Sequence, residues 1–100
     1  MKPIYFHPEA EKEFDLAISY LERQRTGLGL DLQAEVERAV ASIQKNPRIH
    51  ALYKHTNFRK HVLKRFSFNL FYQELDRFIW IAALAHQKRR PDYWIDRTPD

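Results

Sequence analysis

Residues 68–85 read FNLFYQELDRFIWIAALA, and this stretch decides the fold. It contains two strand-length runs, 68–75 and 78–85, that are rich in aromatic and β-branched residues. Asp76-Arg77 separates the two runs and predicts a turn, although it lacks the Asn-Gly or Asp-Gly sequence of a tight hairpin. We therefore predict two neighbouring antiparallel strands joined by a short turn.

Both sides of these two strands are expected to be partly apolar. Side chains alternate along a strand, so Phe68, Leu70 and Tyr72 face one side while Phe71 faces the other. In the second run, Trp80 faces away from the isoleucines on either side of it. Helices are expected to cover one side of the sheet. The other side is covered either by the chain's own ends or by a partner protein.

The first half of the chain has the period of helices instead. Apolar residues recur at helical spacing from Pro8 to a stop at Gly27, and again until Asn46-Pro47 ends the pattern. The short connection between the two segments predicts an antiparallel helical hairpin. Residues 4–6 before the first helix and residues 58–66 after the second are strand-like.

Together these elements give the order β-α-α-β-β-β, an α+β fold. We expect an N-terminal strand and an antiparallel helical hairpin packed on a small antiparallel sheet. One hundred residues suit one hydrophobic core, so we expect a single domain over residues 1–100.

Composition excludes several classes of protein. The chain has no cysteine, which excludes a disulfide framework and a thiolate metal site and suits the cytoplasm. No apolar run is long enough to span a bilayer, so no membrane association is expected. The sequence has no Gly-rich phosphate loop, zinc-protease helix or nucleophile elbow. The five histidines are scattered, and we expect neither a metal nor a cofactor.

The charge is divided unevenly along the chain. Residues 1–50 contain 7 basic and 8 acidic side chains, whereas residues 51–100 contain 10 basic and 5 acidic ones, giving net charges of −1 and +5. A positive half attracts nucleic acid or an acidic protein surface. The alternative is a basic surface that only keeps the protein in solution.

Two segments of the basic half are candidates for chemistry. In residues 54–65, KHTNFRKHVLKR, a strand would project Arg59 and Arg65 to one face and Lys60 to the other. Residues 86–94, HQKRRPDYW, follow the last strand, where arginines can bind a phosphate and Tyr or His can exchange a proton. In a plainer interpretation, His86 is structural, the arginines are ordinary surface charge, and Trp94 packs into the core.

These segments, with the Pro-Glu-Ala helix start and the Asn46-Pro47 helix end, resemble a ParE-type member of the RelE/ParE family of toxins. Such plasmid stabilisation proteins belong to type II toxin–antitoxin systems. The resemblance covers nearly the whole chain. Its most specific part is the string His-x-x-Arg-Arg-Pro-x-Tyr-Trp-x-x-Arg from His86 to Arg97.

The resemblance implies a growth-inhibiting toxin and a cognate antitoxin, largely disordered when free, that folds over it and neutralises it. Operator DNA would be reached only through that antitoxin. Two target classes occur in the family: RelE-like members cut messenger RNA in the ribosome, and ParE-like members poison DNA gyrase. A non-toxic module that only binds its antitoxin is a third possibility, and the shared fold cannot choose among them.

The residues favour the ParE-like target. Two arginines of RelE-like sequences fall on Asn69 and Gln87 here, and each charged contact to a transition state can be worth on the order of 10²-fold. Whether the chain is an enzyme depends on this choice of target. If it is a ribonuclease, the catalytic candidates are Lys60, His86, Arg89 and Tyr93. The candidates for binding a target are Arg59, Arg65, Arg89, Arg90, Tyr93 and Trp94.

Overall fold

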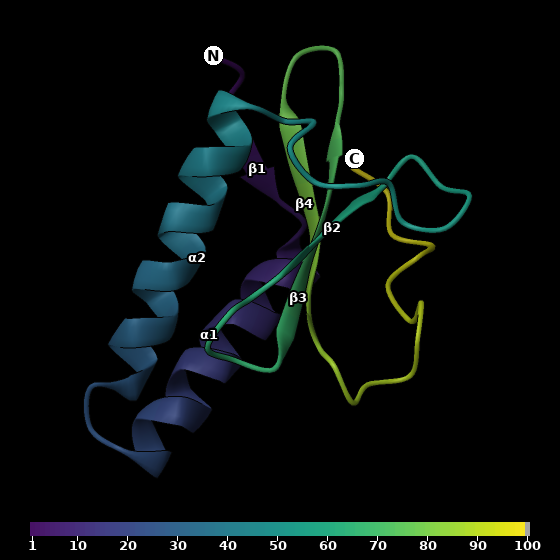
Figure 1. Cartoon of the computed structure of the whole chain (residues 1–100). Helices are drawn as coiled ribbons and strands as arrows, with labels where there is room; N and C mark the ends of the chain where they lie inside the picture. The colour runs from purple at the N-terminus through teal and green to yellow at the C-terminus, as the bar shows by residue number, and fades with distance from the viewer. Residues whose placement is uncertain (100) are drawn as a thin grey trace.

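The computed structural model describes residues 1–99 of the chain (Figure 1). Asp100, the last residue of the expected 1–100 domain, lies outside the described residues. The elements are β1 (Ile4–Phe6), α1 (Pro8–Gln24), α2 (Leu28–Lys45), β2 (Arg59–Val62), β3 (Phe68–Glu74) and β4 (Ile79–His86). The predicted α+β class and the β-α-α-β-β-β order are confirmed.

The four strands form one sheet in the order β1-β4-β3-β2. The β2–β3 and β3–β4 pairs are antiparallel, as predicted, but β1 runs parallel to β4 and makes the sheet mixed. The three residues of β1 contain no pattern that indicates strand direction. β2 is shorter than the predicted strand 58–66, because the chain turns at Lys64, whose backbone N–H donates to Glu35 Oε2 at 2.7 Å.

The helical hairpin is closed by two glycines and one glutamate. Gly27, predicted as the stop of the first helix, adopts φ 91° and is the N-cap of α2. Its backbone N–H and that of Gly29 donate to the two carboxylate oxygens of Glu22, at 2.8 and 3.0 Å. A Cβ on Gly29 would lie 2.6 Å from the carbonyl oxygen of Ile18, so only glycine permits this close approach of α1 and α2.

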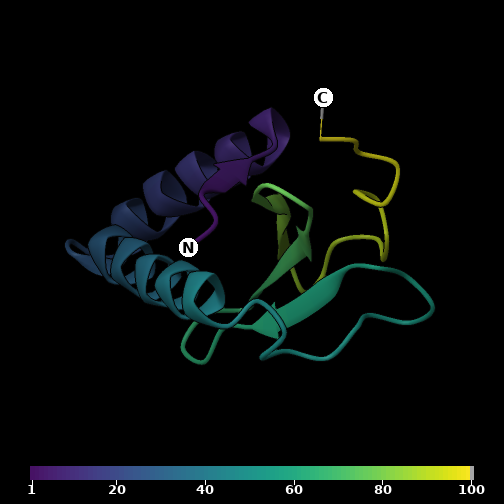
Figure 2. The ribbon, with the colours of Figure 1, turned by 90° about the horizontal axis from the view of Figure 1, so that it is seen from above.

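The two helices cover one face of the sheet (Figure 2). Leu70 and Tyr72 of β3 and Ile79 and Ile81 of β4 point toward the helices, as the alternation of the strands predicted. They form the main core with buried residues of the helices and of the turn before β3, which include Ala17, Leu32, Val36, Ile43 and Leu63. No helix within residues 1–99 is long and apolar enough to cross a membrane.

The opposite face of the sheet is covered by the chain itself. Phe71 and Trp80 project to this side and contact a second cluster of apolar residues. The cover comes from residues 53–58, between α2 and β2, and from residues 93–95 near the C-terminus. Two covers were expected for this face, the chain's own ends or a partner protein, and the structure shows the chain's own residues. The internal segment 53–58 contributes to this cover as well as the C-terminal residues.

Candidate functional site

The segment from His86 to Arg97, here called the C-terminal segment, crosses the second face of the sheet and is anchored by Trp94. Trp94 is only 1% exposed, and its ring stacks on Phe71 with centroids 4.2 Å apart. Phe58 meets it edge-on at 4.9 Å. Trp94 therefore packs into the core, as the plainer interpretation expected, and it also lines the floor of the hollow described below, so its role in target binding stays a prediction.

A turn at Asp92 brings the C-terminal segment back toward the sheet. Asp92 adopts φ 63°, in the left-handed region that Asp tolerates better than most residues. Its carboxylate accepts hydrogen bonds from the Tyr53 hydroxyl at 2.5 Å and from Lys54 Nζ at 2.8 Å. The hydrogen bonds from Lys54 and Tyr53 lower the pKa of Asp92, so this carboxylate stays ionised and is a poor proton acceptor.

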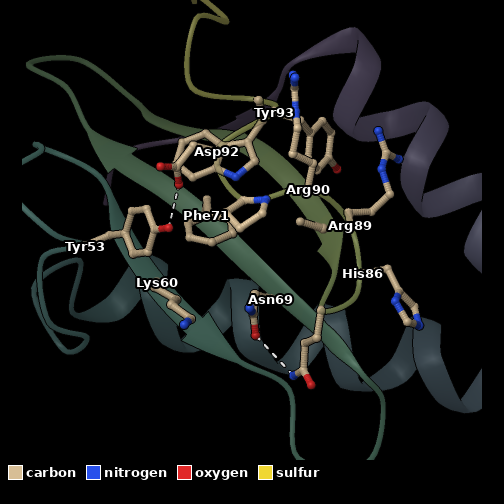
Figure 3. A pocket seen from close by; sticks show the side chains of 13 residues that line it. Tyr53, Lys60, Asn69, Phe71, His86, Arg89, Arg90, Asp92 and Tyr93 are labelled. Atoms are coloured by element: carbon tan, nitrogen blue, oxygen red, sulfur yellow. Dashed lines mark hydrogen bonds between the residues drawn. The ribbon is translucent and has the colours of Figure 1, made fainter.

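Between the C-terminal segment and the sheet lies a cavity of about 180 Å³, here called the central cleft (Figure 3). Lys60 reaches it from β2, Asn69 from β3, and Gln87 and Arg90 from the C-terminal segment. Gln87 Nε2 donates to Asn69 Oδ1 at 3.2 Å. The central cleft thus combines three cationic side chains, Lys60, Arg89 and Arg90, with an amide pair over an aromatic floor, an arrangement suited to binding carboxylates or phosphates.

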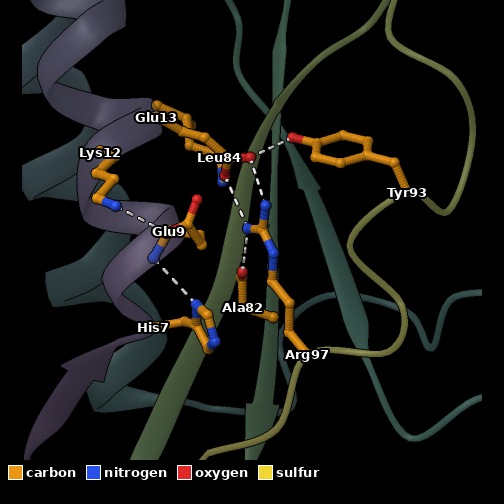
Figure 4. Close-up of polar contacts among 8 residues, drawn as sticks. All are labelled: His7, Glu9, Lys12, Glu13, Ala82, Leu84, Tyr93 and Arg97. Atoms are coloured by element: carbon orange, nitrogen blue, oxygen red, sulfur yellow. Dashed lines mark hydrogen bonds and ion pairs between the residues drawn. The ribbon is translucent and has the colours of Figure 1, made fainter.

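Tyr93 turns its hydroxyl away from the central cleft and toward α1 (Figure 4). The hydroxyl donates to Glu13 Oε2 at 2.5 Å, and Arg97 Nη2 pairs with the same oxygen at 2.8 Å. Burial and the hydrogen bond to Glu13 raise the pKa of Tyr93 far above its usual range. In this arrangement Tyr93 fastens the segment to the helix, and its proton is not available to a ligand in the cleft.

A second hollow, here called the side groove, lies between α1 and the end of β4. It has a volume of about 330 Å³, and Leu16 and Tyr20 of α1 line it although they are 70% and 54% exposed. Its far wall is formed by His86 and Arg89. Large exposed apolar side chains beside cationic ones are typical of a surface that a protein partner covers.

The structure gathers some of the predicted site residues and separates others. Lys60 and Arg90 both line the central cleft. Arg89 lies between cleft and groove, with its guanidinium 3.8 Å from the centre of the Tyr93 ring. His86 packs edge-on against Phe68 at 5.1 Å, on the helix side of the sheet.

The two arginines predicted from the first basic segment lie outside the central cleft. Arg59 Nη1 donates to the carbonyl oxygen of His50 at 2.8 Å, near the end of α2. Arg65 lies in the turn between β2 and β3, where its guanidinium pairs with Asp31 at 3.4 Å. A single binding surface made of all the predicted arginines is therefore not present.

Sequence reasoning missed Glu13, which joins α1 to β4 and to the C-terminal segment. The signal was available, since a glutamate beside the apolar stripe of a helix is costly to bury without partners. His50 and His61 also come together unexpectedly, with ring centroids 4.3 Å apart. Within residues 1–99 no third histidine or carboxylate joins them in a group able to hold a metal.

Solved structures that share this fold include the following three. The chromosomal ParDE system of P. aeruginosa contains a chain with TM-score 0.74 and 15% identity, over 86% of this chain and 96% of that one. The isolated E. coli RelE toxin matches with a TM-score of 0.67 and 18% identity, over 93% of this chain and 92% of that one. A mutant E. coli RelE in complex with a peptide of the antitoxin RelBc matches with a TM-score of 0.66 and 16% identity, over 99% of this chain and 97% of that one. At these identities the likeness concerns the fold.

The sequence comparison identifies the family. No curated protein sequence matches the chain. Residues 4–91, however, match the family described as the ParE toxin of the type II toxin–antitoxin system, parDE. This match includes all six helices and strands and most of the residues that line the central cleft and the side groove. The chain therefore belongs to the ParE toxin family and is a type II toxin of the RelE/ParE superfamily.

Proposed function

We propose that this toxin acts in the cytoplasm as a ParE-like poison of DNA gyrase that binds its target without cleaving a nucleic acid. The observation that carries the proposal is the hydrogen bond from the Tyr93 hydroxyl to Glu13. An RNase that uses the 2′-hydroxyl as nucleophile needs a proton donor and a proton acceptor beside the phosphate. Tyr93 is committed to Glu13, and Asp92 is held ionised by Lys54 and Tyr53.

The central cleft supports binding better than catalysis. Lys60, Arg89 and Arg90 supply positive charge to its lining, and the hydrogen-bonded Asn69–Gln87 amide pair lines it as well. Such a site can hold a carboxylate or a phosphate through charge-assisted hydrogen bonds. Of its described titratable groups, Tyr53 and Asp92 are hydrogen-bonded to each other, and Tyr93 is hydrogen-bonded to Glu13 outside the cleft.

An antitoxin neutralises the toxin, and we place its contact at the side groove. The exposed Leu16 and Tyr20 suit an apolar helix face, and Arg89 at the edge of the groove suits a carboxylate on that helix. Because Arg89 also lines the central cleft, an antitoxin bound in the groove would touch the wall of the target site. Operator DNA is reached through the antitoxin.

Purified toxin tests the proposal when gyrase supercoiling and cleavage of ribosome-bound mRNA are measured side by side. We expect inhibition of supercoiling with the message left intact. Lys60→Ala and Arg90→Ala should weaken inhibition, because each removes a cation from the central cleft. Arg77→Ala is the matched control, since this exposed arginine lies in the turn at the other end of the β3–β4 hairpin. Equal inhibition by all three variants would contradict a role for the cleft.

The alternative is a RelE-like, ribosome-dependent endoribonuclease. Lys60 in the central cleft favours it, because a lysine there could stabilise the charge that develops on a phosphate. Cleavage of mRNA that is lost on Lys60→Ala, with gyrase unaffected, would establish this alternative. A toxin that binds its antitoxin but does not arrest growth would establish the non-toxic module.

A further inference from the structure

Strand β4 has an edge that the short strand β1 leaves uncovered. β1 pairs with β4 only as far as Ile81, whose carbonyl oxygen accepts the His7 N–H at 2.9 Å. The register between β3 and β4 then shifts, because Phe71 pairs with Ala83 while Tyr72 pairs with Ile81. Beyond β1, two backbone groups on this edge need other partners: the carbonyl oxygen of Ala82 and the N–H of Leu84.

Glu13 and Arg97 provide these partners (Figure 4). Glu13 Oε1 accepts the Leu84 N–H at 3.1 Å, and Arg97 Nη1 donates to the Ala82 oxygen at 2.9 Å. The two side chains also pair with each other, at 2.8 and 3.0 Å, and are 14% and 15% exposed. A nearly buried carboxylate is tolerated only when its oxygens are fully bonded, as they are here.

The same carboxylate fixes the C-terminal segment. Tyr93 and Arg97 are four residues apart, and both bind Glu13, so one side chain of α1 holds the segment at two points. Arg89 rests on the Tyr93 ring, and Arg90 follows it into the central cleft. The position of both arginines therefore depends on a residue that does not itself line the cleft.

We propose that Glu13 is a positioning residue for toxicity: through Tyr93 and Arg97 it holds the C-terminal segment against β4 and so places Arg89 and Arg90. This inference is independent of the target, because it applies equally to a gyrase poison and to a ribonuclease. It also assigns Tyr93 a different role from that of a proton donor. By donating to Glu13, its hydroxyl holds in place the C-terminal segment that carries Arg89 and Arg90.

Three variants test the proposal at increasing severity. Tyr93→Phe removes one hydroxyl and keeps the ring under Arg89, Glu13→Gln keeps the shape but removes the charge, and Glu13→Ala removes every bond. The control is Ile43→Val, a conservative change in the core between α2 and the sheet, far from the C-terminal segment. It separates loss of fold stability from loss of positioning.

Two measurements are made on each variant. Amide hydrogen exchange of Leu84 and of residues 86–97 reports local opening, which is distinct from global unfolding. Growth arrest on controlled expression, compared at equal amounts of folded protein, reports toxicity whatever the target. We expect exchange at Leu84 to accelerate on the order of tenfold or more in Glu13→Ala, because a hydrogen bond to a charged group is lost. The same variant should lose most of its growth arrest.

A purely structural role gives a different pattern. Toxicity would then follow the folded fraction alone, so at equal amounts of folded protein the Glu13 variants would arrest growth as strongly as Ile43→Val and the parent toxin. That result overturns the proposal, as does full growth arrest by Glu13→Ala. If positioning is correct, Tyr93→Phe and Glu13→Gln are non-additive in the double variant, because both act through one contact. Additive losses contradict it.

Discussion

The side-chain amide of Gln87 donates to the amide oxygen of Asn69 at 3.2 Å and so joins the end of β4 to the start of β3 inside the central cleft. Position 87 is held in place by its backbone as well, since the Gln87 N–H donates to the carbonyl oxygen of Ser67 at 2.9 Å. These two positions are therefore occupied by neutral side chains that are hydrogen-bonded to each other and add no positive charge to the cleft.

Arginines at these two positions should not create a ribonuclease. The double variant Asn69→Arg/Gln87→Arg restores positive charge, but the Tyr93 hydroxyl stays bound to Glu13. We expect tighter binding of a phosphate-rich probe such as polyphosphate, and no cleavage of ribosome-bound mRNA. Titration and a cleavage assay with the parent toxin as control measure both effects. Site-specific cleavage by the double variant would mean that cations alone were missing.

Trp94→Ala should destabilise the domain strongly. Truncating a buried aromatic residue costs about 3–5 kcal/mol, and Trp94 contacts Phe71, Phe58 and Tyr53. Urea unfolding of this variant beside the exposed Tyr20→Ala, expected to shift stability by about 0.5 kcal/mol or less, measures the difference. Similar unfolding free energies for the two variants would show that Trp94 is not a core anchor.

Stability should fall between pH 7 and pH 5 because of His50 and His61. Burial lowers the pKa of both imidazoles, and the nearby His50 lowers that of His61 further, while Glu35 opposes and Lys64 adds to the shift. The unfolded chain, with histidines titrating near 6.5, then binds more protons than the folded one. The contribution is complete above that pH and is lost as the pH falls.

Thermal unfolding at a series of pH values checks this expectation. The double variant His50→Gln/His61→Gln should flatten the dependence between pH 7 and pH 5, whereas the exposed His55→Gln should leave it unchanged. The window stays above the range in which Glu74 and Asp92 titrate, since lysine and other partners lower the pKa of both carboxyls. An unchanged slope in the double variant would assign the effect to other groups.

Antitoxin binding should depend on the apolar wall of the side groove. Leu16→Lys removes an exposed apolar contact and adds a charge near Arg89, so we expect the affinity for the cognate antitoxin to fall at least about tenfold. Leu30→Lys, at an equally exposed leucine of α2 outside the groove, is the control. Calorimetric titration distinguishes them, and equal losses in both variants would move the antitoxin site elsewhere.

Local patterns in the sequence predict most of this fold. The helical spacing before residue 47 and the alternation after residue 67 predict both helices, the β3–β4 hairpin and the faces of Leu70, Phe71 and Trp80 correctly. The direction of β1 could not be predicted, because its pairing with β4 joins residues 75 positions apart, such as Ile4 and Ile79. Local periodicity contains no information on such contacts.

The site was harder to predict for the same reason. The sequence places Lys60, Arg89, Arg90 and Tyr93 in basic or aromatic segments, and the structure brings all four to one region. The direction of the Tyr93 hydroxyl depends on Glu13, 80 residues away. Because Tyr93 is half-buried and bonded to Glu13, replacing Arg89 and Tyr93 together by alanine is expected to reduce stability as well as toxicity.

The central position of β4 has a consequence for the order of events during translation. β4 lies between β1 and β3 and supplies buried side chains to both cores, yet it is made after every other strand and helix. In a nascent chain that ends before Ile79, β4 is missing, so β1 has no strand that connects it to the β2–β3 pair. The sheet and both apolar clusters are therefore expected to be completed late in synthesis, once β4 is available to pair with β1 and β3.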